Sequence, residues 1–190
     1  MLGAALVRFA DRLSAAVGWL AARLVVAMVA AGALAAALRY LAPSLGIAPA
    51  LNALADVQWM LFSVVFLLGA AWVLAEDGHV RVDVLYGRLS PRRRAAVDLL
   101  GVVLLLLPMC ALLLWATVPA VSEAVALREG ALDAGGLPRW PVKLVLPLGI
   151  ALLAVQGVAQ ALRAVGVLAG SERSEGTGAP GGLAERREAE

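Results

Sequence analysis

The segment that decides the fold reads VQWMLFSVVFLLGAAWVLA, residues 57–75, and contains no charged side chain. A helix needs about 20 consecutive apolar residues to cross the roughly 30 Å of hydrocarbon in a bilayer. Asp56 precedes the run, where a carboxylate suits the N-terminus of a helix. Trp59 and Trp72 lie toward its two ends, as amphipathic rings do at membrane interfaces. The run therefore predicts a transmembrane helix.

Three further apolar runs predict transmembrane spans at residues 17–38, 95–121 and 142–163. Hydrophobic residues make up 62% of the 190 positions and charged residues 16%, with a mean hydropathy of +0.88. Soluble domains are typically about 45–50% apolar and 25% charged. We therefore predict an all-α integral membrane protein with four transmembrane helices. Pro108 is expected to kink the third span, and Pro147 falls in the first turns of the fourth.

Residues 1–16 have the pattern of an amphipathic helix that lies in the membrane interface. Arg8, Asp11 and Arg12 lie on its polar face. The opposite face gathers large apolar residues at helical spacing, namely Leu2, Leu6, Phe9, Leu13, Val17 and Leu20. A cleaved signal peptide is the alternative, because residues 34–37 (LAAA) offer small side chains; the depth of Asp11 and Arg12 in the segment argues against it.

The connection between spans two and three, residues 76–89, mixes charged and aliphatic residues and is expected to lie along the interface. Ser90 and Pro91 then resemble an N-cap followed by proline at the first helical position. Residues 166–190 are rich in glycine, glutamate, arginine and serine, and predict a disordered cytoplasmic tail.

Cations are distributed unequally between the two sides of the predicted membrane. One side would hold both termini and the connection between spans two and three; its arginines are Arg8, Arg12, Arg23, Arg81, Arg88, Arg92, Arg93, Arg94, Arg163, Arg173, Arg186 and Arg187. The other side has Arg39, Arg128, Arg139 and Lys143. By the positive-inside rule both termini are cytoplasmic. Arginines beside membrane spans set orientation, so no nucleic-acid partner is expected.

Residues suited to catalysis or to cofactor binding are scarce. Ionisable groups at mid-depth in a membrane commonly mark ion or proton paths, and none is expected at mid-depth here. Gln156 and Gln160 share a helix face, and hydrogen bonding between helices is favoured for them over substrate binding. His79 is the only histidine and Cys110 the only cysteine, which excludes a bis-histidine haem in this chain. We expect no enzyme activity, no cofactor and no metal.

Several segments carry a family resemblance: residues 56–62 (DVQWMLF), 66–71 (FLLGAA) and 79–85 (HVRVDVL). Further matching pieces are Pro108, residues 135–138 (GGLP), Lys143, residues 146–149 (LPLG) and residues 152–156 (LLAVQ). Together they resemble the small permease subunit of tripartite ATP-independent periplasmic (TRAP) transporters, over about residues 20–165. The HVRVDV stretch is the most specific of these signals.

The resemblance implies a sodium-coupled bacterial uptake system for organic anions, in the inner membrane. Its partners would be a large permease subunit and a periplasmic substrate-binding protein, beside the lipid bilayer. The small subunit would act as a scaffold for the large carrier subunit. The resemblance assigns motif or partner-interface roles to Asp56, Gln58, Trp59, His79, Arg81, Asp83, Pro147 and Gln156. For His79, Arg81 and Asp83 the alternative is a solvated surface turn.

Two other functions are compatible with four such spans. One is a membrane anchor subunit of a redox enzyme, which would require haem or quinone chemistry. The other is a self-assembling, channel-like protein. In a TRAP-type system the periplasmic binding protein would select the substrate.

Overall fold

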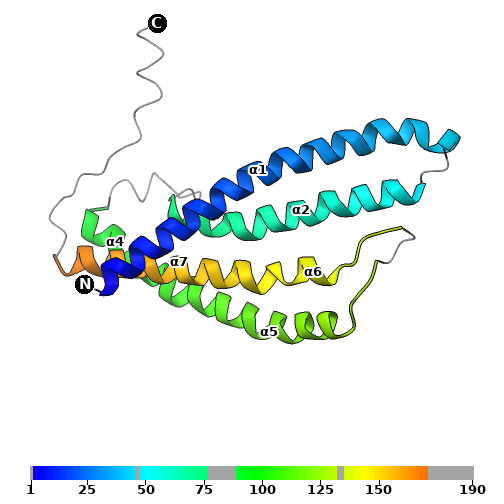
Figure 1. Ribbon diagram of the computed structural model, residues 1–190. Helices are drawn as coiled ribbons and strands as arrows, with labels where there is room; N and C mark the ends of the chain where they lie inside the picture. Colours follow the sequence, from blue (N-terminus) through cyan, green and yellow to red (C-terminus); the bar gives the residue numbers. More distant parts are fainter. Residues whose placement is uncertain (1, 46–47, 77–88, 132–134, 171–190) are drawn as a thin grey trace, which may run out of the picture.

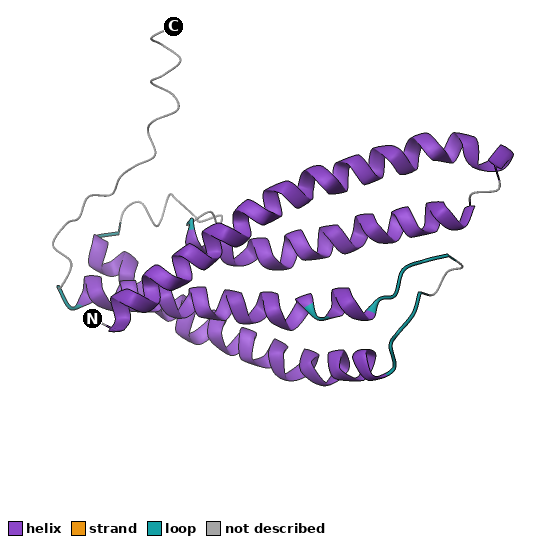
Figure 2. Cartoon of the chain, in the orientation of Figure 1, coloured by secondary structure: helices purple, strands orange, loops and turns teal. Residues whose placement is uncertain are grey.

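The computed structural model describes residues 2–45, 48–76, 89–131 and 135–170. All regular elements in these ranges are helices (Figure 2): α1 Leu2–Leu45, α2 Ala48–Ala75, α4 Pro91–Gly101, the π-helix η1 Val102–Leu106, α5 Leu107–Ala126, α6 Trp140–Lys143 and α7 Val145–Leu168. Four helical stretches are long and apolar enough to cross a membrane: Gly3–Tyr40, Ala50–Ala75, Pro91–Ala126 and Trp140–Leu168. This confirms the predicted all-α class with four membrane-spanning helices.

Helix α7 is central to the arrangement, since it contacts α1, α2, α4 and α5. Figure 1 shows the start of α1, helix α4 and the end of α7 together at one end of the molecule, which we call the terminal end. The end of α1, the start of α2, the end of α5 and helix α6 lie at the opposite end, which we call the loop end. Both ends of the described chain thus lie on the same side, as four crossings require.

The first helix differs from the expectation. The predicted interfacial helix 1–16 and the predicted span 17–38 form one continuous helix of 44 residues. At 1.5 Å per residue this helix is about 66 Å long, so it extends beyond a hydrocarbon core of roughly 30 Å. The position of its first 16 residues in the membrane interface stays a prediction.

The face that α1 turns toward the other helices consists of small residues. Ala10, Ser14, Gly18 and Ala21 are buried, and they recur every three or four residues along one side. The large apolar residues on the other side are exposed, Leu6 at 40% and Phe9 at 60%. Small side chains let helix backbones approach closely where lipid gives no hydrophobic drive for association. The small residues of α1 therefore form its packing face.

Prolines interrupt the third and fourth spans. The disruption expected at Pro108 takes the form of the π-helix η1, where the Leu107 N–H donates to the Val102 carbonyl five residues earlier. Single π-helical turns occur inside α-helices and are among the causes of helix kinks. In the fourth span the helix is interrupted at Leu144, between α6 and α7. Pro147, three residues later, has no N–H to donate to the Lys143 carbonyl.

Candidate functional site

A polar network joins α1 to α7 toward the terminal end; we call it the terminal-end network. Ser14 Oγ donates a hydrogen bond of 3.0 Å to Gln156 Oε1. Gln156 Nε2 in turn donates to Asp11 Oδ1 at 3.2 Å. The Arg163 guanidinium forms an ion pair with the same carboxylate. Ser14 and Gln156 are each only 1% exposed, so the network lies inside the contact between the helices.

Burial explains why these residues pair. Burying an amide without a hydrogen-bond partner costs about 1–3 kcal/mol of folding free energy in protein mutational data. Gln156 has a partner for its oxygen and another for its nitrogen. Its predicted role in hydrogen bonding between helices is therefore confirmed. Gln160, one turn further, differs: its Oε1 is buried and has no hydrogen-bond partner among the described residues.

Sequence reasoning missed Asp11 and Ser14 as partners. Asp11 was expected on a polar face turned away from the membrane, whereas its carboxylate faces α7. The available signal was the spacing of Ala10, Ser14 and Gly18, because a polar residue in a row of small residues marks a close helix contact.

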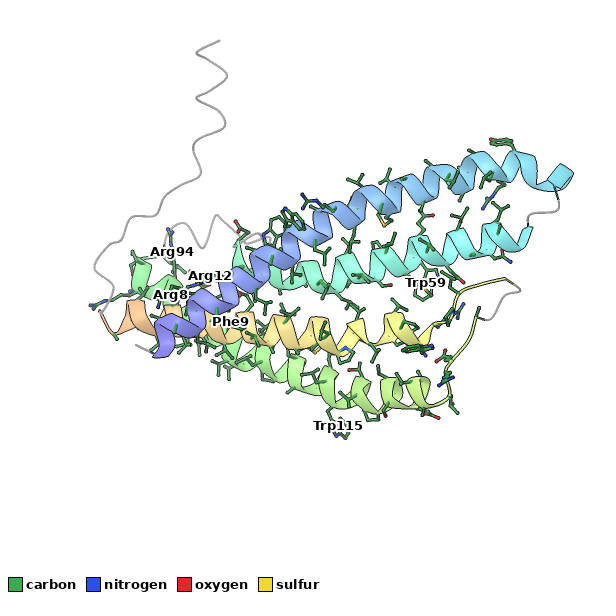
Figure 3. The ribbon with its side chains drawn as sticks, in the orientation of Figure 1. Arg8, Phe9, Arg12, Trp59, Arg94 and Trp115 are labelled. Carbon is green, nitrogen blue, oxygen red and sulfur yellow. The ribbon has the colours of Figure 1, made fainter. Side chains whose placement is uncertain are left out.

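A second polar contact fixes the loop end; we call it the loop-end contact. Asp56 is 7% exposed. Its two oxygens accept hydrogen bonds of 2.8 Å each, one from Trp59 Nε1 and one from the Leu137 N–H. The Arg139 guanidinium lies 5.8 Å from the centroid of the Trp59 ring. Asp56 thereby joins α2 to the chain just before α6, and Figure 3 shows Trp59 beside that chain.

The expectation that Asp56 sits at a helix N-terminus is wrong. Helix α2 begins at Ala48, so Asp56 lies in its third turn, beyond the reach of the N-terminal dipole. Its buried negative charge is stabilised by two N–H donors and by nearby Arg139 instead. Charge-assisted hydrogen bonds of this kind are about twice as strong as neutral ones.

Internal contacts also stabilise the connection between α5 and α6. Lys143 forms an ion pair with Glu129. The Glu129 carbonyl accepts hydrogen bonds from Arg139 N at 3.0 Å and Trp140 N at 3.4 Å. Arg128 has a φ of 46°, a left-handed conformation that is uncommon for a residue with a Cβ. These contacts join the part of the connection that follows α5 to the part that leads into α6.

The other predicted residues are placed as follows. Gln58 is exposed and lies against α1, where a Cβ added to Gly32 would come within 2.9 Å of its Nε2. Pro147 lies in the first turn of α7. His79, Arg81 and Asp83 lie outside the described residues. Of the predicted set, Asp56 and Trp59 are brought together, while Gln156 is far from them in the terminal-end network.

Glycines mark the closest helix contacts. A Cβ at Gly149 of α7 would lie 2.8 Å from the Leu67 carbonyl oxygen of α2, and one at Gly18 of α1 would lie 2.4 Å from the Trp72 ring. Within the described residues, no three His, Cys, Asp or Glu side chains group as they would to hold a metal ion. The polar side chains described above hold helices and a connection in place.

Comparison with known families agrees with this helical frame. A family model described as "Tripartite ATP-independent periplasmic transporters, DctQ component" matches residues 39–166, more than half of the chain. Searches of the curated proteins and of the solved structures gave no match. The matched range covers α2, α4, η1, α5, α6 and nearly all of α7, so the chain belongs to the DctQ-component family of TRAP transporters.

Proposed function

We propose that this chain is the small membrane subunit of a TRAP-type, sodium-coupled uptake system for organic anions, and that it acts as a scaffold for the large carrier subunit. The main observation in support is that its polar side chains join elements of the fold to one another. In the described residues they join α1 to α7 and α2 to the chain before α6. Such contacts stabilise a frame.

The cavity between α1 and α2 supports the same proposal. It has a volume of about 440 Å³, and its walls consist of glycine, alanine, valine, phenylalanine and tryptophan side chains, Phe66 and Trp72 among them. An organic anion requires cationic or N–H donor groups, and hard cations such as sodium require several oxygen ligands. Neither set of groups is present in these walls. This cavity is therefore unsuited to the transported species, whose site we place in the large subunit.

The outer surfaces of the helices are apolar and suit either lipid or a membrane partner. Trp115 of α5 is 77% exposed and points away from the other helices in Figure 3. Leu104 and Leu105 of η1 are also strongly exposed. We place this frame in the bacterial inner membrane with the terminal end in the cytoplasm, because arginines concentrate there. The large permease subunit would lie beside it, and a periplasmic substrate-binding protein would deliver the solute at the loop end.

Co-expression with the large permease subunit tests the proposal. We expect a tagged form of this chain to purify with the large subunit as one complex in mild detergent, and the large subunit to unfold at lower temperature without it. The family match lends no support to the redox-anchor alternative. A chain that purifies only with copies of itself, while the large subunit is stable and active alone, would overturn the scaffold role.

A further inference from the structure

Arg23 interrupts the apolar outer surface of α1. Its guanidinium carbon lies 3.2 Å from the centroid of the Trp19 ring, one turn earlier, and both side chains are exposed. Ala21, two residues before Arg23, is buried; at about 100° per residue the two positions lie on opposite sides of the helix. Arg23 has no ion pair or hydrogen bond among the residues that the structure describes. The Arg23 charge thus faces outward and lies against an aromatic ring.

The register of α1 against α2 gives the depth of each residue of α1. A Cβ added to Gly18 would meet the Trp72 ring, and one added to Gly32 would meet the Gln58 side chain. The two contacts are 14 residues apart on each helix, 18 to 32 and 58 to 72. The antiparallel register is therefore constant over this stretch, and Figure 1 shows the two helices side by side.

This register places Arg23, five residues after Gly18, level with Leu67. Leu67 lies nine residues from Glu76 and eleven from Asp56, the charged residues at the two ends of the apolar run of α2. At 1.5 Å per residue these separations are about 13 Å and 16 Å. The backbone of Arg23 is therefore deep in the membrane-spanning part, where the sequence predicted no ionisable group.

A charge at this depth requires a counter-group. Charged residues in membrane spans almost always face protein or a water-filled cavity, because an unpaired charge in hydrocarbon is costly. The guanidinium of Arg23 leans toward Trp19, whose position on α1 is still about 8 Å inside the level of Glu76. Lipid phosphates lie farther out, beyond the hydrocarbon. A protein partner is therefore favoured over a lipid head group.

We propose that Arg23, stacked on Trp19, docks against the large permease subunit and pairs with a carboxylate of one of its transmembrane helices. This pairing rests on the proposed function, because it requires the large subunit as partner. A guanidinium keeps its charge in a dry environment and matches a carboxylate through two parallel hydrogen bonds. The Trp19 ring, 61% exposed, adds apolar contact area, and tryptophan and arginine are both enriched at protein interfaces.

Titration of a fluorescently labelled large subunit with this chain in mild detergent measures the affinity. Arg23→Met removes the charge and keeps an extended side chain. We expect the affinity to fall about 30-fold or more, because truncating one member of a buried charge pair leaves the other unpaired. Arg23→Lys keeps the charge and should restore part of the affinity.

Arg12→Met is the matched control. Arg12 is exposed and lies eleven residues before Arg23, about three turns away on the same side of α1 but at the terminal end (Figure 3). Its substitution should leave the affinity for the large subunit unchanged. Equal losses in Arg12→Met and Arg23→Met would show a general effect of positive charge and would overturn the pairing.

The stability of the isolated chain gives a second readout. Without its partner the Arg23 charge faces lipid or detergent, so Arg23→Met should leave the Tm of the chain unchanged or raise it. A role of Arg23 inside this chain predicts a lower Tm instead. Circular dichroism in micelles measures the Tm, and a clear decrease would contradict the proposal.

Photo-crosslinking identifies what covers this side of α1. Val26 is 70% exposed and lies one turn after Arg23, so benzoyl-phenylalanine in its place leaves the arginine intact. We expect a crosslink, located by mass spectrometry, to a helix of the large subunit that contains Asp or Glu. Adducts with lipid alone, with a second copy of this chain, or with a helix that has no acidic residue would each overturn the pairing.

The proposed function and the pairing fail in different ways. If the unmodified chain does not bind the large subunit, the scaffold role fails and the pairing with it. If the unmodified chain binds and Arg23→Met binds equally well, the scaffold role stands and the pairing at Arg23 is wrong.

Discussion

Replacing Gly149 with alanine tests the closest backbone contact between α2 and α7. The added Cβ would lie 2.8 Å from the Leu67 carbonyl oxygen, 2.9 Å from Leu67 Cβ and 3.0 Å from the Leu67 carbonyl carbon. Ordinary contacts between non-bonded carbon atoms are about 3.5–4.0 Å. Since two of these three neighbours are backbone atoms, the contact can be relieved only if one helix moves away from the other. Overpacking of this kind costs about 1–3 kcal/mol.

A second effect of the substitution has the opposite sign. Alanine is favoured over glycine in a helix interior by about 1 kcal/mol. Gly69→Ala in α2 has this benefit without the clash, because no atom lies within 4 Å of a Cβ added there. The difference between the two variants therefore isolates the contact. We expect Gly149→Ala to be less stable than Gly69→Ala by about 1–3 kcal/mol.

Unfolding of the purified chain in mixed micelles, followed by circular dichroism, measures this difference. For a protein of this size each kcal/mol corresponds to about 2–4 °C in Tm, so the two variants should differ by several degrees. Equal stability of the two variants, or a more stable Gly149→Ala, would refute the packing of α7 on α2 at Gly149.

Three other predictions concern the polar contacts and the orientation. Ser14→Ala and Gln156→Leu should each destabilise the chain by about 0.6–1.7 kcal/mol, and the double variant should cost less than their sum; strict additivity in a double-mutant cycle would show that the pair does not interact. Asp56→Ala should accelerate hydrogen exchange of the Leu137 amide by about 10- to 100-fold, and unchanged exchange measured by mass spectrometry would exclude that hydrogen bond. Arg128→Cys should react with an impermeant maleimide in intact cells, whereas reaction only after lysis would reverse the orientation.

The sequence predicts the number and kind of elements because lipid restricts the choice. Backbone groups in hydrocarbon must be satisfied internally, so an apolar run such as residues 57–75 has to be a helix. The same reasoning predicted four membrane-spanning helices, and the structure has four helices long and apolar enough to cross a membrane. It did not locate the start of α2 at Ala48. Asp56 was taken as the boundary of the span, whereas the helix begins eight residues before it. The role of Asp56 was misassigned for this reason.

Partners across the fold were harder to predict. Gln156 was expected to hydrogen-bond between helices, but its partners Ser14 and Asp11 come from a segment that appeared to be interfacial. The large apolar face of that segment, with Phe9, was expected to face the membrane. In a bilayer that face has no preference for protein over lipid, and the small residues around Ser14 determine the contact instead. Which face of a helix packs against its neighbour depends on how closely the two backbones approach. The pattern of a single helix does not reveal that distance.

Transport measured in proteoliposomes tests the central claim most directly. Vesicles would contain this chain alone, the large subunit alone, or both, with the binding protein, an organic anion and an inward sodium gradient outside. We expect no uptake with this chain alone and sodium-dependent uptake when both subunits are present. Sodium-driven uptake in vesicles that contain only this chain would contradict its role as a scaffold.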